Sequence, residues 1–134
     1  MANPNIVNVT SIYGNTAYVI PSTTSATTSW TYNGTTSLTG LTPAVGTVNR
    51  VTSIVVSNTT GSAATATVAI GNNATFGSAT VVTYFAYQIS VPAGASLIVV
   101  DKTTSLYVTE NQSVGVTSGT ASALTYTATF EAIT

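Results

Sequence analysis

The chain has 134 residues, of which only 4% are charged, and its formal net charge is −1. An ordinary soluble domain is about a quarter charged, so Thr and Ser must supply most of the polar surface here. A net charge near zero gives no attractive field for nucleic acid, for acidic substrates or for anionic membranes. The length corresponds to a single domain that spans residues 1–134.

Several residue types that carry out chemistry are missing. The chain has neither Cys nor His, which excludes disulfides and thiol or imidazole catalysis within it. Asp101, Glu110 and Glu131 lie in separate turns and strands, so the sequence predicts neither a paired-carboxylate site nor a calcium site. No signal peptide is apparent, and the longest apolar runs are too short to span a bilayer. We therefore expect a protein that is not an enzyme and needs no cofactor.

Strand-like segments alternate with turn residues in the first third of the chain. Residues 6–13 are predicted to form a strand, Gly14-Asn15 a two-residue hairpin turn, and residues 16–20 the return strand. Residues 21–48 are rich in Ser, Thr, Gly and Pro. This segment is predicted to be mainly loop, with one short strand, and is a candidate for contact with a neighbouring subunit.

The clearest β pattern lies between residues 49 and 73. Two arms, residues 50–57 and 64–70, carry β-branched residues at a period of two. Asn58 and Gly61 between them tolerate a positive φ. The pattern predicts a β-hairpin.

The second half of the chain contains further strand patterns. Residues 81–91 are predicted to form a long strand, and the continuous apolar run 96–100 a central strand covered on both faces. Shorter strands are expected at residues 106–108 and 114–116. Residues 124–133 alternate cleanly between apolar side chains and Thr or Glu, which predicts a last strand with one buried face.

These segments predict an all-β fold. Seven to nine short strands, with turn residues every eight to twelve positions and no helical period, are typical of an antiparallel β-sandwich of the jelly-roll or Greek-key type. The residues predicted to form the core are Ile54, Val56, Val68, Ile70, Phe85, Tyr87, Ile89, Leu97, Val99, Leu106, Val108, Val114, Val116, Tyr126, Ala128 and Phe130.

Five aromatic residues are candidates for a binding face: Trp30, Tyr32, Tyr84, Phe85 and Tyr87. Such residues can stack on sugar rings, but in strands they more often belong to a core or an interface. The sequence favours core or interface, because no His or carboxylate stands beside them to orient a sugar.

Arg50 is the only arginine in the chain. Because Arg is enriched at interfaces, it is a candidate anchor for a partner; the alternative is a solvated strand end. The predicted interface residues are Arg50, Trp30, Tyr32 and Tyr84. Exposed sheet edges are normally protected by charge or Pro, and the scarcity of charge here indicates a component of an assembly.

Three stretches resemble a known family: residues 51–58, residues 91–100 with VPAGASLIVV, and residues 106–116 with LYVTENQSVGV. They are similar to small β-sandwich virion structural proteins of tailed phages, especially marine and cyanobacterial ones. The resemblance implies a non-enzymatic role in the virion, as a capsid decoration or cement protein or as a neck or tail component. A carbohydrate- or receptor-binding module of a tail fibre is the alternative.

A homotrimer is the expected oligomer. Low net charge promotes association, closed symmetric assemblies hide strand edges, and decoration proteins of the resembled type sit at quasi-three-fold positions of a shell. The expected partners are copies of the chain and the major capsid protein or other virion proteins, with neither nucleic acid nor membrane. The expected location is the virion, after assembly in the host cytoplasm.

Overall fold

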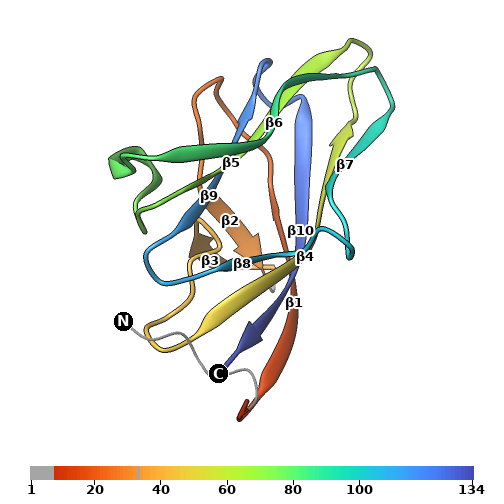
Figure 1. The fold of residues 1–134 in the computed structure, drawn as a ribbon. Helices are drawn as coiled ribbons and strands as arrows, with labels where there is room; N and C mark the ends of the chain where they lie inside the picture. Colours follow the sequence, from red (N-terminus) through yellow and green to blue (C-terminus); the bar gives the residue numbers. More distant parts are fainter. Residues whose placement is uncertain (1–7, 33) are drawn as a thin grey trace.

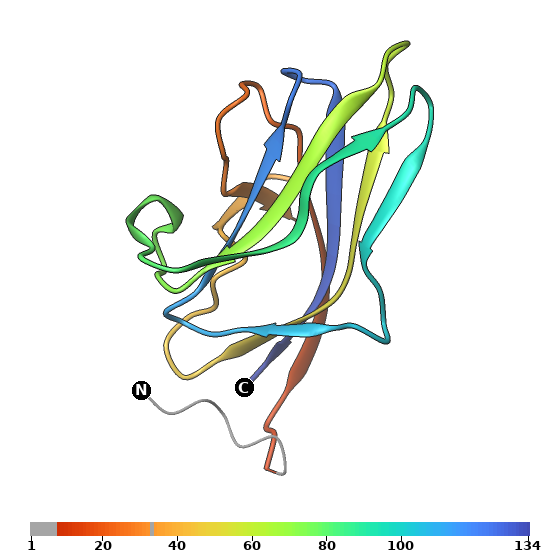
Figure 2. The same cartoon turned by 45° about the horizontal axis from the view of Figure 1, so that its top comes forward.

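Two antiparallel β-sheets face each other in the computed structural model, which describes residues 8–32 and 34–134 (Figures 1 and 2). The large sheet has the order β3-β2-β1-β10-β4-β7, with β8 also paired to β4, and the small sheet has the order β6-β5-β9. This architecture confirms the predicted β-sandwich, with ten strands in the described part of the chain. The strands are β1 (Ile12–Val19), β2 (Ser29–Tyr32), β3 (Thr36–Thr39), β4 (Val48–Asn58), β5 (Ala64–Gly71), β6 (Val82–Val91), β7 (Ser96–Val100), β8 (Leu106–Val108), β9 (Ser113–Ser118) and β10 (Leu124–Ile133), and a short 3-10 helix, η1, spans Phe76–Ser78.

The strand order is that of a jelly roll. Eight jelly-roll strands, numbered along the chain, form two sheets in the orders 1-8-3-6 and 2-7-4-5. In this protein the first sheet is formed, in that order, by β1, β10, β4 and the β7–β8 pair. The second sheet contains β9, β5 and β6 in the positions of jelly-roll strands 7, 4 and 5. The position of jelly-roll strand 2 is taken by Thr27, which forms a single β-bridge with Val116 of β9. The β2–β3 hairpin extends the large sheet beyond β1.

Strand β10 runs through the middle of the large sheet between β1 and β4. Its alternating sequence explains the position: Leu124, Tyr126, Ala128 and Phe130 are buried, whereas the threonines between them face outward. A bulge between Thr129 and Phe130 shifts the register with β4 and increases the local twist. The alternation predicted for this strand is confirmed up to Phe130.

The predicted hairpin at residues 49–73 is wrong. Both arms are strands, but β4 lies in the large sheet and β5 in the small sheet, so they do not pair. The connection after Asn58 crosses from one sheet to the other (Figure 2). A period of two shows that each arm buries one face, and this is equally true of two strands in opposite sheets.

The predicted turn at Gly14-Asn15 is also wrong, because β1 continues through both residues as it pairs with β10. Glycine and Asn tolerate turns but do not force them, and the partner strand keeps this segment extended. Of the strand predicted at residues 6–13, residues 6 and 7 lie outside the described residues.

Strand β7 is not a central strand. It pairs with β4 on one side and ends the large sheet, and Ile98 is 65% exposed. The continuous apolar run of residues 96–100 therefore lies at an edge with one covered face. Leu97 and Val99 are only partly buried against the core.

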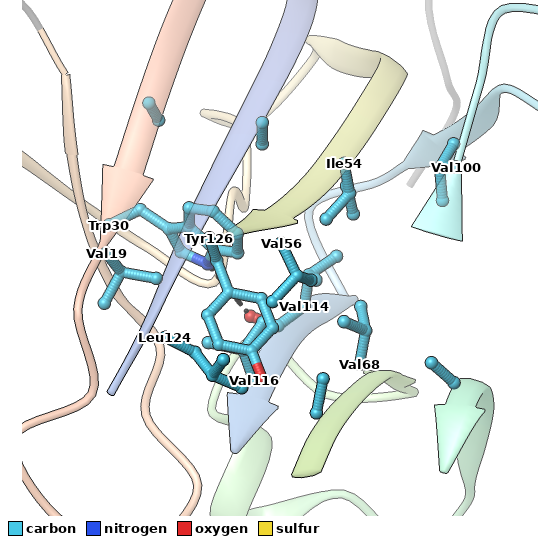
Figure 3. Packing of buried hydrophobic residues seen from close by; sticks show 14 of the residues in the cluster. Val19, Trp30, Ile54, Val56, Val68, Val100, Val114, Val116, Leu124 and Tyr126 are labelled. Carbon is cyan, nitrogen blue, oxygen red and sulfur yellow. Dashed lines mark hydrogen bonds between the residues drawn. The ribbon is translucent and has the colours of Figure 1, made fainter. Parts of the chain in front are cut away.

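The core fills the space between the sheets (Figure 3). Nine predicted core residues are buried: Ile54, Val56, Val68, Val108, Val114, Val116, Tyr126, Ala128 and Phe130. Ile70, Leu97, Val99 and Leu106 are partly buried against this cluster. The prediction is wrong for Phe85, Tyr87 and Ile89, which are exposed on β6. Six further buried residues were not in the list of predicted core residues: Trp30, Leu41, Val51, Val91, Val100 and Leu124.

Parts of the segments 21–32 and 34–48 pack against their own chain. The indole of Trp30 is fully buried, and its Nε1–H donates to the Val114 carbonyl at 3.2 Å. Gly40 has a φ of 64°, and an added Cβ would collide with Ser113, so a glycine is required here for its carbonyl to accept from Val114 N at 2.7 Å. The segment thus covers the open edge of β9.

Candidate functional surfaces

The structure separates the four predicted interface residues. Trp30 has no exposed surface, so it belongs to the core and its prediction as an interface residue is wrong. Tyr32 is half-buried, and its ring meets Phe130 edge-on with centroids 6.3 Å apart. Arg50 lies on the outer side of the large sheet, and Tyr84 lies on the small sheet. No single site therefore contains all four.

Arg50 faces Glu131 on the neighbouring strand. Their Cα atoms are register partners between β4 and β10, and Arg50 NH1 lies 3.6 Å from Glu131 Oε2. Each side chain is about one-third exposed, so solvent screens the pair and its contribution to stability is small. Arg50 Nε is buried and makes no hydrogen bond to the described residues.

The outer side of the large sheet forms a broad surface, which we name the large-sheet face. One row of register partners runs from Tyr18 through Thr127 and Val55 to Ile98. A second row, parallel to the first, includes the register partners Arg50 of β4 and Tyr107 of β8. Thr129 of β10 lies between the two rows. Strands are spaced about 4.8 Å apart, so each row of four spans about 14 Å.

The ends of these rows expose apolar side chains. Tyr18, Ile98 and Tyr107 are all exposed, as is Ile12 at the start of β1. The threonines of β10 separate them with uncharged polar side chains. Such a surface loses little on desolvation, because hydroxyl groups can hydrogen-bond locally.

A groove of about 420 Å³ crosses the large-sheet face beside β7. Val55 and Ile98 supply apolar surface, and Asp101, Lys102 and Glu131 supply charge. Together with Arg50, which pairs with Glu131, four of the five charged residues of the chain gather here. The sequence did not predict this grouping, because it depends on how β7 and β10 are placed around β4.

Two carboxylates, Asp101 and Glu131, line this groove. Asp101 accepts hydrogen bonds from the Thr103 hydroxyl at 2.6 Å and from the backbone N–H groups of Thr103 and Thr104 at 2.9 and 3.0 Å. These bonds, that of the Thr103 side chain foremost, lower the pKa of Asp101. Because its partners lie only two and three residues further along the chain, Asp101 is a turn-forming carboxylate.

The small sheet carries a second candidate site on its outer side. Tyr84 and Tyr87 of β6 are 52% and 58% exposed, and their rings meet edge-on with centroids 4.8 Å apart. They line a groove together with Phe76 of η1 and Thr67 of β5. Sequence reasoning named both tyrosines as sugar-binding candidates but missed Phe76 and Thr67, for which no sequence pattern gave a signal.

Metal ligands do not cluster in the described part of the chain. Residues 8–32 and 34–134 contain no group of three or more His, Cys, Asp or Glu side chains that could hold a metal ion. Among the same residues, no helix is long and apolar enough to cross a membrane. Comparison with protein-family models, with curated proteins and with solved structures finds no match.

Proposed function

We propose that this protein is a non-enzymatic structural component of a bacteriophage particle, of the capsid decoration or cement type. In this proposal it is assembled in the host cytoplasm, remains on the virion and stabilises the shell through protein–protein contacts. The single observation that best supports the role is the large-sheet face, because it exposes apolar residues such as Ile98 and Tyr107 and because the four charged residues that gather at its groove, two positive and two negative, give it no net charge. In this proposal these apolar side chains are buried against neighbouring chains.

In this proposal the large-sheet face makes the contacts to the partners. Copies of the chain close into a homotrimer through the large-sheet face, which hides its apolar side chains and the free edge at β7. The trimer then binds the major capsid protein. The jelly-roll order is compatible with this role, since viral shell proteins use it, but lectins and cupins do so too. The sequence resemblance is what favours the virion.

A neck or tail component is the competing virion role, and copy number separates the two. Quantitative mass spectrometry of purified virions that encode this chain should find it in amounts comparable to the major shell protein. A few copies per particle would overturn the decoration role in favour of the neck or tail. Absence from purified particles would overturn the virion role itself.

A further inference from the structure

A groove of about 220 Å³ lies on the outer side of the small sheet. The groove that is lined by charged residues lies on the other sheet, so the two grooves are separate. Its floor is made of small or hydroxylated residues, Thr67, Ala69, Gly115 and Thr117, and its walls carry Phe76, Tyr84 and Tyr87. We name it the aromatic groove.

Two irregularities of β6 place both tyrosines on the same side. Residues three apart in a regular strand point to opposite faces, so Tyr84 and Tyr87 could not share a groove without a bulge. The register passes from Ala69 opposite Tyr84 to Ala66 opposite Ile89, so β6 has two more residues than β5 over this stretch. Bulges of this kind redirect side chains and are frequent next to functional sites.

Gln88 holds the second bulge in a strained conformation. Its φ of 50° lies in the left-handed region, which is unfavourable for a residue with a Cβ. The Gln88 N–H donates to Thr67 Oγ1 at 3.0 Å, so a side chain of the groove floor fixes the bulge. Such strained residues are frequent at ligand-binding and active sites.

The opposite wall is fixed by a glycine. The ring of Phe76 rests on Gly115, where an added Cβ would lie 2.8 Å from the nearest ring carbon. Any side chain at position 115 would therefore displace the ring. Phe76 also approaches Gly71, so the short helix η1 is held against the small sheet at two points.

The lining decides which ligand fits. Every residue that lines the aromatic groove is uncharged, and the aromatic walls stand beside the hydroxyls of Thr67 and Thr117 and the amide of Gln88. A pyranose ring matches this pattern, since its C–H faces pack on aromatic rings and its rim of hydroxyls pairs with amides and hydroxyls. An apolar side chain of a partner protein would use the rings but leave the polar groups unused.

We infer that the aromatic groove binds one neutral hexopyranose unit of a glycan, with Tyr84, Tyr87 and Phe76 as the stacking residues. The volume is below the roughly 300–1,000 Å³ of pockets for drug-sized ligands, which limits the occupant to about one ring. This inference does not depend on the proposed virion role. An open site of this size should bind a single ring with a dissociation constant on the order of 1 mM, and many copies on one particle would raise the avidity.

The test is a titration of the full chain with methyl glycosides of glucose, galactose, mannose, N-acetylglucosamine and rhamnose, followed by NMR. At least one should bind, with the largest amide shifts at Tyr84, Tyr87 and Gln88. Tyr84→Ala and Tyr87→Ala should each weaken binding by about tenfold or more. Tyr13→Ala is the matched control, because Tyr13 is a similarly exposed tyrosine on β1 of the other sheet, and it should bind like the original chain.

Four outcomes would overturn the inference. They are absence of binding to every glycoside at tens of millimolar, binding that shifts residues outside the groove, unchanged affinity in both folded tyrosine variants, and a preference for glucuronate over the neutral sugars. Loss of attachment to a partner protein in the Tyr84 variant, without any glycoside binding, would instead make the groove a protein contact. The amide shifts are measured on the original chain. The inference can therefore still be tested if a tyrosine variant fails to fold.

Discussion

Asn58 and Val91 join the two sheets: Nδ2 of Asn58, the last residue of β4, donates to the carbonyl of Val91, the last residue of β6, at 2.9 Å. The same nitrogen donates to the Ser62 carbonyl at 2.8 Å. Oδ1 accepts from the backbone N–H of Thr60 at 3.0 Å and from its hydroxyl at 2.8 Å. With 2% of its surface exposed, this amide directs the chain across the sandwich.

Asn58→Asp should therefore destabilise the fold more than Asn58→Ala. Alanine leaves the buried carbonyls of Val91 and Ser62 without donors, at a cost of about 2–3 kcal/mol. A carboxylate adds a buried charge that faces those carbonyls, so the cost should reach about 3–5 kcal/mol at neutral pH. Urea titration at pH 7 and at pH 4 measures both. Because the protonated acid can donate, the Asp variant should recover part of its stability at pH 4, and equal costs without recovery would contradict this role.

Trp30 should behave as a core residue. Trp30→Ala should cost about 3–5 kcal/mol, whereas Tyr84→Ala, at an exposed position, should cost less than about 0.5 kcal/mol. Trp30 is the only tryptophan, so its fluorescence reports on this site alone. Emission typical of a buried indole, unchanged on dilution, is expected. A red shift of this emission on dilution would mean that Trp30 is covered by a neighbouring copy of the chain.

Tyr126 should make the fold sensitive to alkali. Burial raises the pKa of Tyr126 to about 12 from its usual 10.0, and its hydroxyl donates to the Thr117 carbonyl at 2.6 Å. The folded chain therefore holds this proton more tightly than the unfolded chain. The stabilisation is complete below pH 10 and is lost as the pH rises toward 12, by up to roughly 2 kcal/mol. Tyr126→Phe should flatten this part of the stability curve, and an equally steep fall in the variant would contradict the assignment.

The large-sheet face should hold a homotrimer together. Analytical ultracentrifugation should find a trimer at micromolar concentration, and Ile98→Glu should dissociate it, because the substitution places a charge in an apolar contact. Tyr84→Glu, on the small sheet, is the control and should leave the trimer intact. Salt should have little effect, since few ion pairs exist to be screened. A stable monomer would contradict the trimer, and dissociation by salt alone would contradict the apolar contact.

Sequence periodicity predicted the strands better than it predicted their partners. Ile54 and Val56 lie two residues apart in β4, as side chains on one buried face do, and their burial was predicted. Sheet membership was not, because the turn chemistry of Asn58 permits both a hairpin and a crossing between sheets. The hydrogen bond from Asn58 to Val91 favours the crossing between the sheets, and it joins residues that are 33 positions apart in the sequence.

The aromatic groove escaped prediction for a related reason. Phe85, Tyr87 and Ile89 are spaced at a period of two, which predicts a common inward face. The bulges of β6 insert residues into that alternation, so Ala86 and Val91 are buried instead. A left-handed residue such as Gln88 leaves no mark in the sequence, because glutamine is not a residue that favours this conformation.

The most direct test of the proposed role is a cryo-electron microscopy reconstruction of an intact particle that encodes this chain. The account predicts jelly-roll density for the chain on the outer surface of the shell, grouped in threes, with the large-sheet face turned toward neighbouring copies. Density confined to the neck or tail, or a particle without density for this chain, would contradict it.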